Sequence, residues 1–162
     1  MRARLTLDPR KYRDLIQAMA GLGAVVRRSG LEAGLLELVK IRASQINGCG
    51  YCLDMHTKDA RANGETEQRI HLLPAWREAL VYTERERAAL AWTEAVTRLE
   101  HQEVPDSVYD AARAEFTEEE LVALTLAVVH INGWNRLSIA FRREAGDYEP
   151  GSLSEVVTAH AS

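Results

Sequence analysis

Apolar residues recur three and four positions apart along almost the whole chain of 162 residues. Near the N-terminus they fall on one helical face at Tyr12, Leu15, Ile16, Met19, Leu22 and Val26. This spacing is typical of an amphipathic α-helix, and no run alternates apolar and polar residues for long enough to indicate a strand. The sequence therefore predicts an all-α fold, a multi-helix bundle in which several helices pack around one core.

Helix-start and helix-stop signals divide this pattern into segments. Thr83 and Thr117 each begin a Thr-x-x-Glu capping box, in which two side chains satisfy the free N–H groups of a helix start. Asp8 and Pro9 are expected to begin the first helix, and glycines at 30, 48 and 64 to end three of the helices. The predicted helices cover about residues 9–28, 31–46, 49–63, 66–73, 83–100, 105–115 and 117–143.

One domain accounts for this length, because about 100 to 200 residues per domain is usual. The predicted helical domain comprises residues 1–145. Residues 146–162 are mostly small and polar and include Pro150 and Gly151, so we expect a loose C-terminal tail.

The charge balance argues against nucleic-acid and membrane partners. The 20 Lys and Arg residues face 24 Asp and Glu residues, so the net charge is -4 and no basic field is present. The longest apolar stretch, residues 121–131, is much shorter than the ~20 residues that span a bilayer. No apolar run of signal-peptide length follows the N-terminus. We therefore expect a soluble protein of the cytoplasm.

The two cysteines of the chain form a pair, Cys49 and Cys52. In a cytosolic protein such a pair indicates redox or metal chemistry before it indicates a structural disulfide. Three positions apart on a helix, the thiols lie close enough for a disulfide after modest adjustment. The Asn47-Gly48 break places them at a helix N-terminus, where partial positive charge favours the nucleophilic thiolate.

Two ionisable residues are in register with the thiols. His56 follows Cys52 by four positions, so its imidazole lies one turn further along the same helix face. Glu37 lies on the preceding helix, which must fold back after the break, and its carboxylate can then reach the imidazole directly or through a water. The candidate catalytic residues are therefore Glu37, Cys49, Cys52 and His56.

Residues 37–56, ELVKIRASQINGCGYCLDMH, resemble the core of the alkylhydroperoxidase AhpD-like branch of the carboxymuconolactone decarboxylase family. The resemblance implies an all-helical, thiol-dependent peroxidase that assembles as a trimer or hexamer, with no cofactor. It implies that Cys52 attacks a hydroperoxide, that Cys49 resolves the sulfenic acid into a disulfide, and that Glu37 and His56 relay protons. An external dithiol then reduces the enzyme. Tyr51 departs from the histidine that precedes the second cysteine in the founding AhpD members.

The order of the two thiols can also be argued from physical effects. The helix N-terminus favours the thiolate most strongly at Cys49, but dipole stabilisation there is worth only ~0.3–1 kcal/mol. A base in direct reach has a larger effect, so His56 is expected to make Cys52 the attacking thiolate. Cys49, nearer the loop, is expected to be the more exposed thiol.

Three other functions are compatible with the same residues. A zinc site could use both cysteines and His56, with Glu37 as the fourth ligand that a closed site needs. A second alternative is the decarboxylase chemistry for which the wider family is named, although a lactone decarboxylation has no need of a dithiol. The third is a non-enzymatic oligomeric scaffold or redox-sensing protein.

His130 lies in a strongly apolar helix and is expected to be a satisfied core histidine.

An internal similarity links two helical segments. Residues 37–41 and 120–124 align at an offset of 83 residues, which places Asn132 on Cys49 and Asn135 on Cys52. Either buried helices simply look alike, or a helical hairpin was duplicated and one copy kept its thiols. The second segment is apolar nearly all round between residues 121 and 131, more than one core-facing stripe requires, which favours a homo-oligomer.

Overall fold

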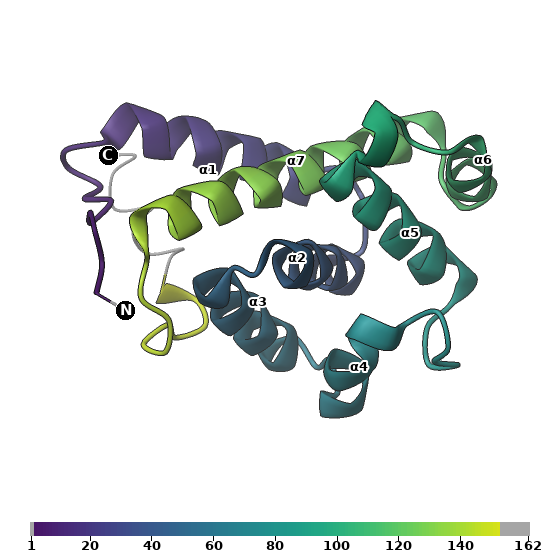
Figure 1. Ribbon diagram of the computed structural model, residues 1–162, viewed down its shortest axis with the longest axis horizontal. Coiled ribbons are helices and arrows are strands. Elements are labelled where there is room, and N and C mark those ends of the chain that lie inside the picture. The colour runs from purple at the N-terminus through teal and green to yellow at the C-terminus, as the bar shows by residue number, and fades with distance from the viewer. Residues whose placement is uncertain (1, 153–162) are drawn as a thin grey trace.

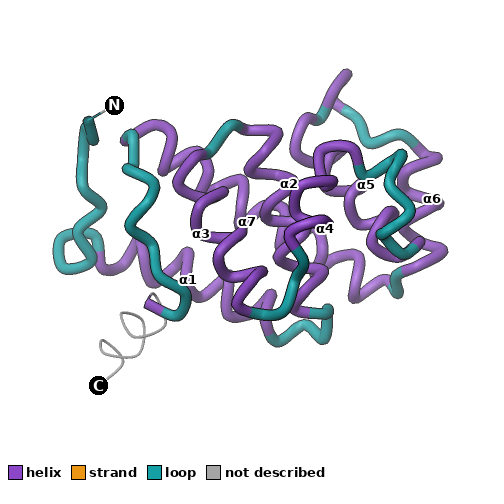
Figure 2. The backbone as a smooth tube through the Cα atoms, turned by 90° about the horizontal axis from the view of Figure 1, so that it is seen from below, coloured by secondary structure: helices purple, strands orange, loops and turns teal. Residues whose placement is uncertain are grey.

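The structure, a computed structural model, describes residues 2–152. Within that range the chain is helical and contains no β-strand (Figures 1 and 2), which confirms the all-α prediction. The elements in chain order are α1 (Arg13–Arg27), α2 (Ala33–Asn47), α3 (Gly50–Ala62), α4 (Glu67–Leu72), η1 (Leu73–Ala75), α5 (Glu84–Arg98), η2 (Glu100–Gln102), α6 (Asp106–Glu115) and α7 (Glu118–Phe141). No helix in the described range is long and apolar enough to cross a membrane.

Helix α2 lies at the centre of the fold and packs against α3, α5 and α7 (Figure 1). Its residues Leu38, Val39 and Ile41 have no exposed surface. Because neighbours surround the helix, its polar residues Glu37 and Ser44 are buried too. Buried polar groups need hydrogen-bond partners, and these two find theirs on α3 and α7.

The helix starts and stops follow the predicted signals at most boundaries. Both capping boxes are present, at Thr83 with Glu86 and at Thr117 with Glu120. The first helix differs from the prediction, because α1 begins at Arg13.

Asp8 organises a turn ahead of α1 instead of capping the helix. Its carboxylate accepts a hydrogen bond from the Arg10 N–H at 2.8 Å, and its carbonyl accepts bonds from the N–H groups of Lys11 and Tyr12. The local turn satisfies these groups, so the helix starts one turn later than the Asp-Pro signal predicts.

The two ends of the described chain meet near the C-terminal end of α7 and the start of α3 (Figure 1). At the N-terminal end, the Arg4 N–H donates to the carbonyl of Phe141 at 3.0 Å. At the other end, the Lys58 ammonium on α3 donates to the carbonyl of Tyr148 at 2.9 Å, and the Tyr148 hydroxyl donates to Asp59 at 2.8 Å. This part of the predicted tail is therefore attached to α3, not loose, whereas residues 153–162 lie outside the described range.

Candidate active site

The helix break between α2 and α3 builds the thiol site. Gly48 ends α2 in the left-handed conformation, with φ 71°, which a residue without Cβ adopts at no steric cost. Cys49 then occupies the N-cap position of α3, and its sulfur accepts a hydrogen bond from the backbone N–H of Cys52 at 3.4 Å. The sulfur thus takes the place of the usual capping oxygen and lies at the positive end of the helix dipole.

Both cysteines are free and buried, each with 1% of its surface exposed. The side-chain hydrogen bond from Cys52 has the largest effect on Cys49. Together with the Cys52 backbone N–H it outweighs burial and lowers the pKa of Cys49 to about 7. The same hydrogen bond, added to burial, raises the pKa of Cys52. When the reduced pair loses one proton, the thiolate therefore forms on Cys49 and the remaining proton stays on Cys52.

Helix α7 contributes two polar residues that were not predicted as site residues. Asn135 and Ser138 are buried and hydrogen-bond to the thiols, and the Cys52 sulfur lies 3.8 Å from the Ser138 hydroxyl. Hydrogen bonds from both lower the pKa of Cys49. The alignment of Asn135 with Cys52 in the internal similarity marked this position in the sequence, but it did not indicate contact with the thiols.

A network of amides and hydroxyls holds Asn135 in place. Its side chain donates to the Ser44 hydroxyl at 3.0 Å and accepts a hydrogen bond from Asn47 at 2.8 Å. The Asn47 amide also donates to Asn132 at 2.9 Å. Residues from the end of α2 and from α7 thus satisfy one another and fix the donor beside the sulfurs.

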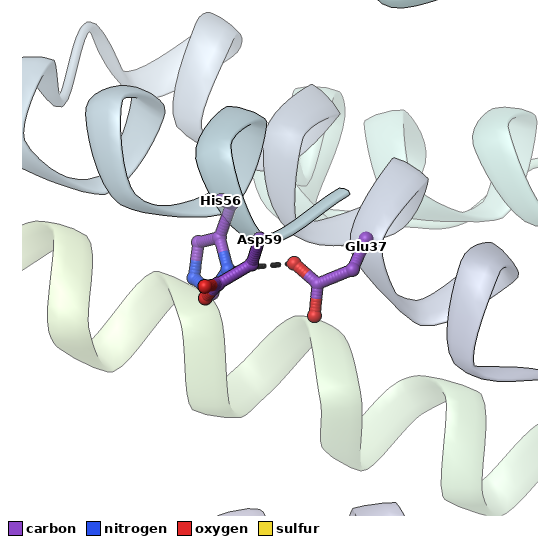
Figure 3. Close-up of side chains that lie close together, drawn as sticks. All are labelled: Glu37, His56 and Asp59. Carbon is purple, nitrogen blue, oxygen red and sulfur yellow. Dashed lines mark hydrogen bonds and ion pairs between the residues drawn. The ribbon is translucent and has the colours of Figure 1, made fainter. Parts of the chain in front are cut away.

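Glu37 and His56 meet directly, which is one of the two arrangements that the sequence predicts. The His56 Nδ1 and Glu37 Oε2 atoms are 2.8 Å apart (Figure 3). The Lys40 ammonium lies 2.6 Å from Glu37 Oε1. Burial opposes ionisation of Glu37, but the hydrogen bond and charge of His56, together with Lys40, lower its pKa to about 2. Glu37 is therefore a carboxylate that accepts the Nδ1 proton and orients the imidazole.

Asp59 is a further residue of this cluster that was not predicted (Figure 3). Burial is the main cause that raises its pKa, and repulsion from Glu37 adds to it, although the Tyr148 hydroxyl bond acts in the opposite direction. Potential ligand atoms of Glu37, His56 and Asp59 lie within 4.8 Å of one another, and this is the one such group within residues 2–152. It contains no cysteine, so the described structure does not assemble the zinc ligand set considered from the sequence.

The structure contradicts two expectations about the thiols. Within residues 2–152, the hydrogen bond of His56 goes to Glu37, and none joins its imidazole to either sulfur. The spacing of four residues puts His56 one turn from Cys52, but its Nδ1 hydrogen-bonds to the Glu37 carboxylate on α2. In addition, Cys49 is not more exposed than Cys52, because its sulfur caps α3 by accepting the Cys52 N–H and both residues are 1% exposed.

His130 belongs to the packing of α1 against α7, as expected of a satisfied histidine. Its Nε2 atom accepts a hydrogen bond from the Trp134 indole at 2.9 Å. Burial lowers its pKa to about 4, so the ring is neutral at physiological pH. A side chain at Gly23 of α1 would meet this ring at 2.9 Å, which explains the glycine there.

Known proteins share both the sequence and the fold. YdfG of Bacillus subtilis (strain 168), an uncharacterized protein, is 44% identical over 130 residues, which cover 80% of this chain and 88% of YdfG. The crystal structure of ATU0492 from Agrobacterium tumefaciens, a protein of unknown function suggested to be an AhpD antioxidant defence protein, has a TM-score of 0.85. Its sequence is 41% identical, and the match covers 91% of this chain and 100% of that one.

A shorter match comes from the alkyl hydroperoxide reductase AhpD of Hyphomonas neptunium (strain ATCC 15444). It is 41% identical over 46 residues, which are 28% of this chain and 26% of that protein. The sequence profile of the carboxymuconolactone decarboxylase family matches residues 12–95, a range that contains both cysteines, Glu37 and His56. The chain therefore belongs to the carboxymuconolactone decarboxylase family and has its AhpD-like, all-helical fold.

Proposed function

We propose that this protein is a thiol-dependent hydroperoxide reductase that cycles between a dithiol and a Cys49–Cys52 disulfide. One observation carries the proposal: two free thiols hydrogen-bond to each other at a helix N-terminus, and the pKa of one is lowered to about 7. A thiolate at neutral pH beside a second thiol is the arrangement that peroxide reduction requires. The family membership supports the same chemistry.

In the proposed first step, the Cys52 proton passes to the Cys49 thiolate, and the Cys52 thiolate attacks the peroxide. The O–O bond breaks, the alcohol leaves with the proton from Cys49, and Cys52 becomes a sulfenic acid. The Cys49 thiolate then attacks the Cys52 sulfur, forms the disulfide and releases hydroxide, which is protonated to water. The two thiols thus supply the two electrons that convert ROOH into ROH and H₂O.

Glu37 and His56 are the proposed proton relay. With the carboxylate bound to Nδ1, the Nε2 atom of His56 is the position from which a proton can be given or taken, through a water, at the departing oxygens. Because Cys49 accepts the Cys52 proton and passes it to the alcohol, the relay is needed to protonate the hydroxide that leaves when the disulfide forms, and not for the first deprotonation. This differs from the role that the sequence spacing suggested for His56.

The proposal includes an assembly and a compartment. Val122 and Val129 on the outer side of α7 are 57% and 51% exposed, which suits the homo-oligomer, a trimer or hexamer, that the family resemblance implies. The two free thiols suit the reducing cytoplasm, where an external dithiol returns the disulfide to the reduced state.

Single-cysteine variants test the proposal. Each variant receives one equivalent of cumene hydroperoxide, and a dimedone trap followed by mass spectrometry locates any sulfenic acid. We expect Cys49→Ser to give a trapped sulfenate on Cys52, and Cys52→Ser to consume peroxide no faster than free cysteine does. The opposite pattern would assign the attack to Cys49, where the resting thiolate lies. Inert wild-type protein would favour the scaffold function.

A further inference from the structure

A basic groove of about 690 Å³ opens beside the start of α3, at the end of the molecule where the two chain ends meet (Figure 1). Its lining includes Cys49 but not Cys52. The glycines on either side of Cys49 keep this approach open, because a Cβ at Gly48 or Gly50 would have no heavy atom within 4 Å. A small molecule in the groove therefore meets the Cys49 end of the pair first.

Three arginines and one glutamate line the groove, so its charge is positive. Arg2 comes from the N-terminal segment, and Arg142 and Arg143 follow α7. Within residues 2–152 none of the three has a carboxylate partner. The carboxylate of Glu144 accepts the N–H of Ala3 at 3.1 Å and helps to hold the N-terminal segment in place.

These arginines differ from those that support the fold. Arg42, for example, is half-buried in an ion pair with Glu94 at 2.7 Å. Arg143 instead lies over the ring of Tyr51, with its guanidinium carbon 3.7 Å from the ring centroid. A guanidinium stacked on an aromatic ring keeps its N–H fork free for a carboxylate or phosphate. Tyr51, the residue that departs from the family pattern, thus positions a cation at the mouth of the thiol site.

We propose that this groove binds the reductant, and that the reductant is a small dithiol bearing a carboxylate, which Arg142 and Arg143 hold beside Cys49. This inference rests on the proposed disulfide cycle. One thiolate of the bound dithiol attacks the Cys49 sulfur, the Cys49–Cys52 bond breaks, and Cys52 leaves as a thiolate that takes up a proton. The second thiol of the reductant, as its thiolate, then attacks the mixed disulfide, which releases Cys49 and the cyclic disulfide of the reductant.

The test uses full-length protein oxidised to the disulfide beforehand and omits peroxide from the reduction step. Dihydrolipoate and dihydrolipoamide are the probes, because they differ by one carboxylate and carry the same dithiol. Protein thiols are counted over time by alkylation and mass spectrometry. At low salt we expect dihydrolipoate to reduce the disulfide at least fivefold faster, and we expect high salt to remove most of the difference.

Variants assign the preference to the groove. Arg142→Asn keeps a residue that tolerates the left-handed backbone at this position, φ 54°, and Arg143→Gln removes the charge over Tyr51. In each, the ratio of the two rates should fall toward one through loss of the dihydrolipoate rate. Arg28→Gln, at an exposed arginine outside the groove, should leave the ratio unchanged.

Equal rates for the two dithiols in wild-type protein, or a preference that survives both groove variants, would overturn the proposal. A second arm compares oxidation by linoleic acid hydroperoxide and by its methyl ester. If the arginines affect only this arm, the groove selects the peroxide, and the assignment to the reductant is wrong. If the protein shows the dithiol preference but consumes no peroxide, the proposed peroxidase function fails while the anion-binding groove stands.

Discussion

The thiol-bearing hairpin and the helix that packs against it have similar sequences but different backbones. At an offset of 83 residues, Asn47 and Gly48 correspond to His130 and Ile131. The first pair breaks the helix between α2 and α3, whereas the second lies inside α7, which runs on for 24 residues. One glycine able to adopt a left-handed conformation therefore decides which segment has free N–H groups to offer a sulfur.

The same difference explains why α7 contributes side-chain groups to the thiol site and no backbone N–H groups. Within a continuous helix, the backbone N–H groups are used by the helix itself. Asn135 in α7 therefore reaches the thiols through its amide, whereas Cys49 in the hairpin accepts a backbone N–H. The broken helix supplies the nucleophiles and the unbroken one supplies neutral donors to them. Matched substitutions in the two segments test this division.

The largest difference in peroxidase rate is expected between two Glu→Gln substitutions at aligned positions, Glu37→Gln and Glu120→Gln. Glu37→Gln removes the carboxylate that orients His56, so the peroxidase rate should fall well over tenfold, since general acid–base assistance is worth ~10²–10⁴-fold. Glu120→Gln keeps the capping box, because Gln serves at that position as well, and its rate should stay within about twofold. Stopped-flow measurement of peroxide consumption compares the two.

Unfolding as a function of pH separates a proton-relay role for Glu37 from a purely structural one. The pKa of Glu37 is lowered in the folded protein, from 4.5 to about 2. Its ionisation therefore stabilises the fold above about pH 4.5, and this contribution is lost as the pH falls toward 2. Glu37→Gln should flatten that part of the stability curve. If the peroxidase rates of Glu37→Gln and Glu120→Gln fall only as far as their stabilities fall, the relay assignment is wrong.

The next largest effect is expected at the two asparagines of α7. Asn135→Ala and Asn132→Ala each remove a buried hydrogen-bonding group and should each cost about 1–3 kcal/mol in urea unfolding. Of the two, Asn135 hydrogen-bonds to the thiols and lowers the pKa of Cys49, so only Asn135→Ala should raise the pH midpoint of iodoacetamide alkylation above that of the wild-type protein. Equal midpoints in the two variants would remove Asn135 from the thiol site.

Local signals in the sequence were sufficient for the helices and for part of the site. Capping boxes and glycines act over a few residues, so the boundaries around Thr83, Thr117 and Gly48 could be predicted. Glu37 and His56 also meet as expected, because the break forces α3 to fold back against α2. Asp8 misled the prediction of α1, since the same residue type begins both turns and helices.

The contributions of α7 could not be predicted from spacing. Asn135 and Ser138 are more than 80 positions from the cysteines, and nothing local indicates which face of a largely apolar helix meets them. Which of the two thiols ionises first could not be predicted from the sequence either. It depends on the hydrogen bond between the two sulfurs and on the capping geometry of Cys49, whereas the sequence argument relied on proximity to His56.

The smallest expected effect comes from two Gly→Ala substitutions, one inside α2 and one at the residue that ends it, which should change the stability in opposite directions. At Gly34 the backbone is helical and a Cβ meets nothing within 4 Å, so Gly34→Ala should stabilise the protein by about 0.4–1 kcal/mol through a less flexible unfolded chain. At Gly48 a Cβ also has space, but φ is 71°, so Gly48→Ala should destabilise by about 1–2 kcal/mol from backbone strain alone.

The thiols report how the protein relieves that strain. If α2 extends by a residue in Gly48→Ala, Cys49 loses its capping position and the N–H group that its sulfur accepts. The pH midpoint of its alkylation should then rise above that of the wild-type protein, because this N–H group lowers the pKa of Cys49. If the break persists, the midpoint stays and only the stability falls. Stabilisation by Gly48→Ala, equal to that of Gly34→Ala, would contradict both outcomes, because a left-handed break would then not be what separates this hairpin from α7.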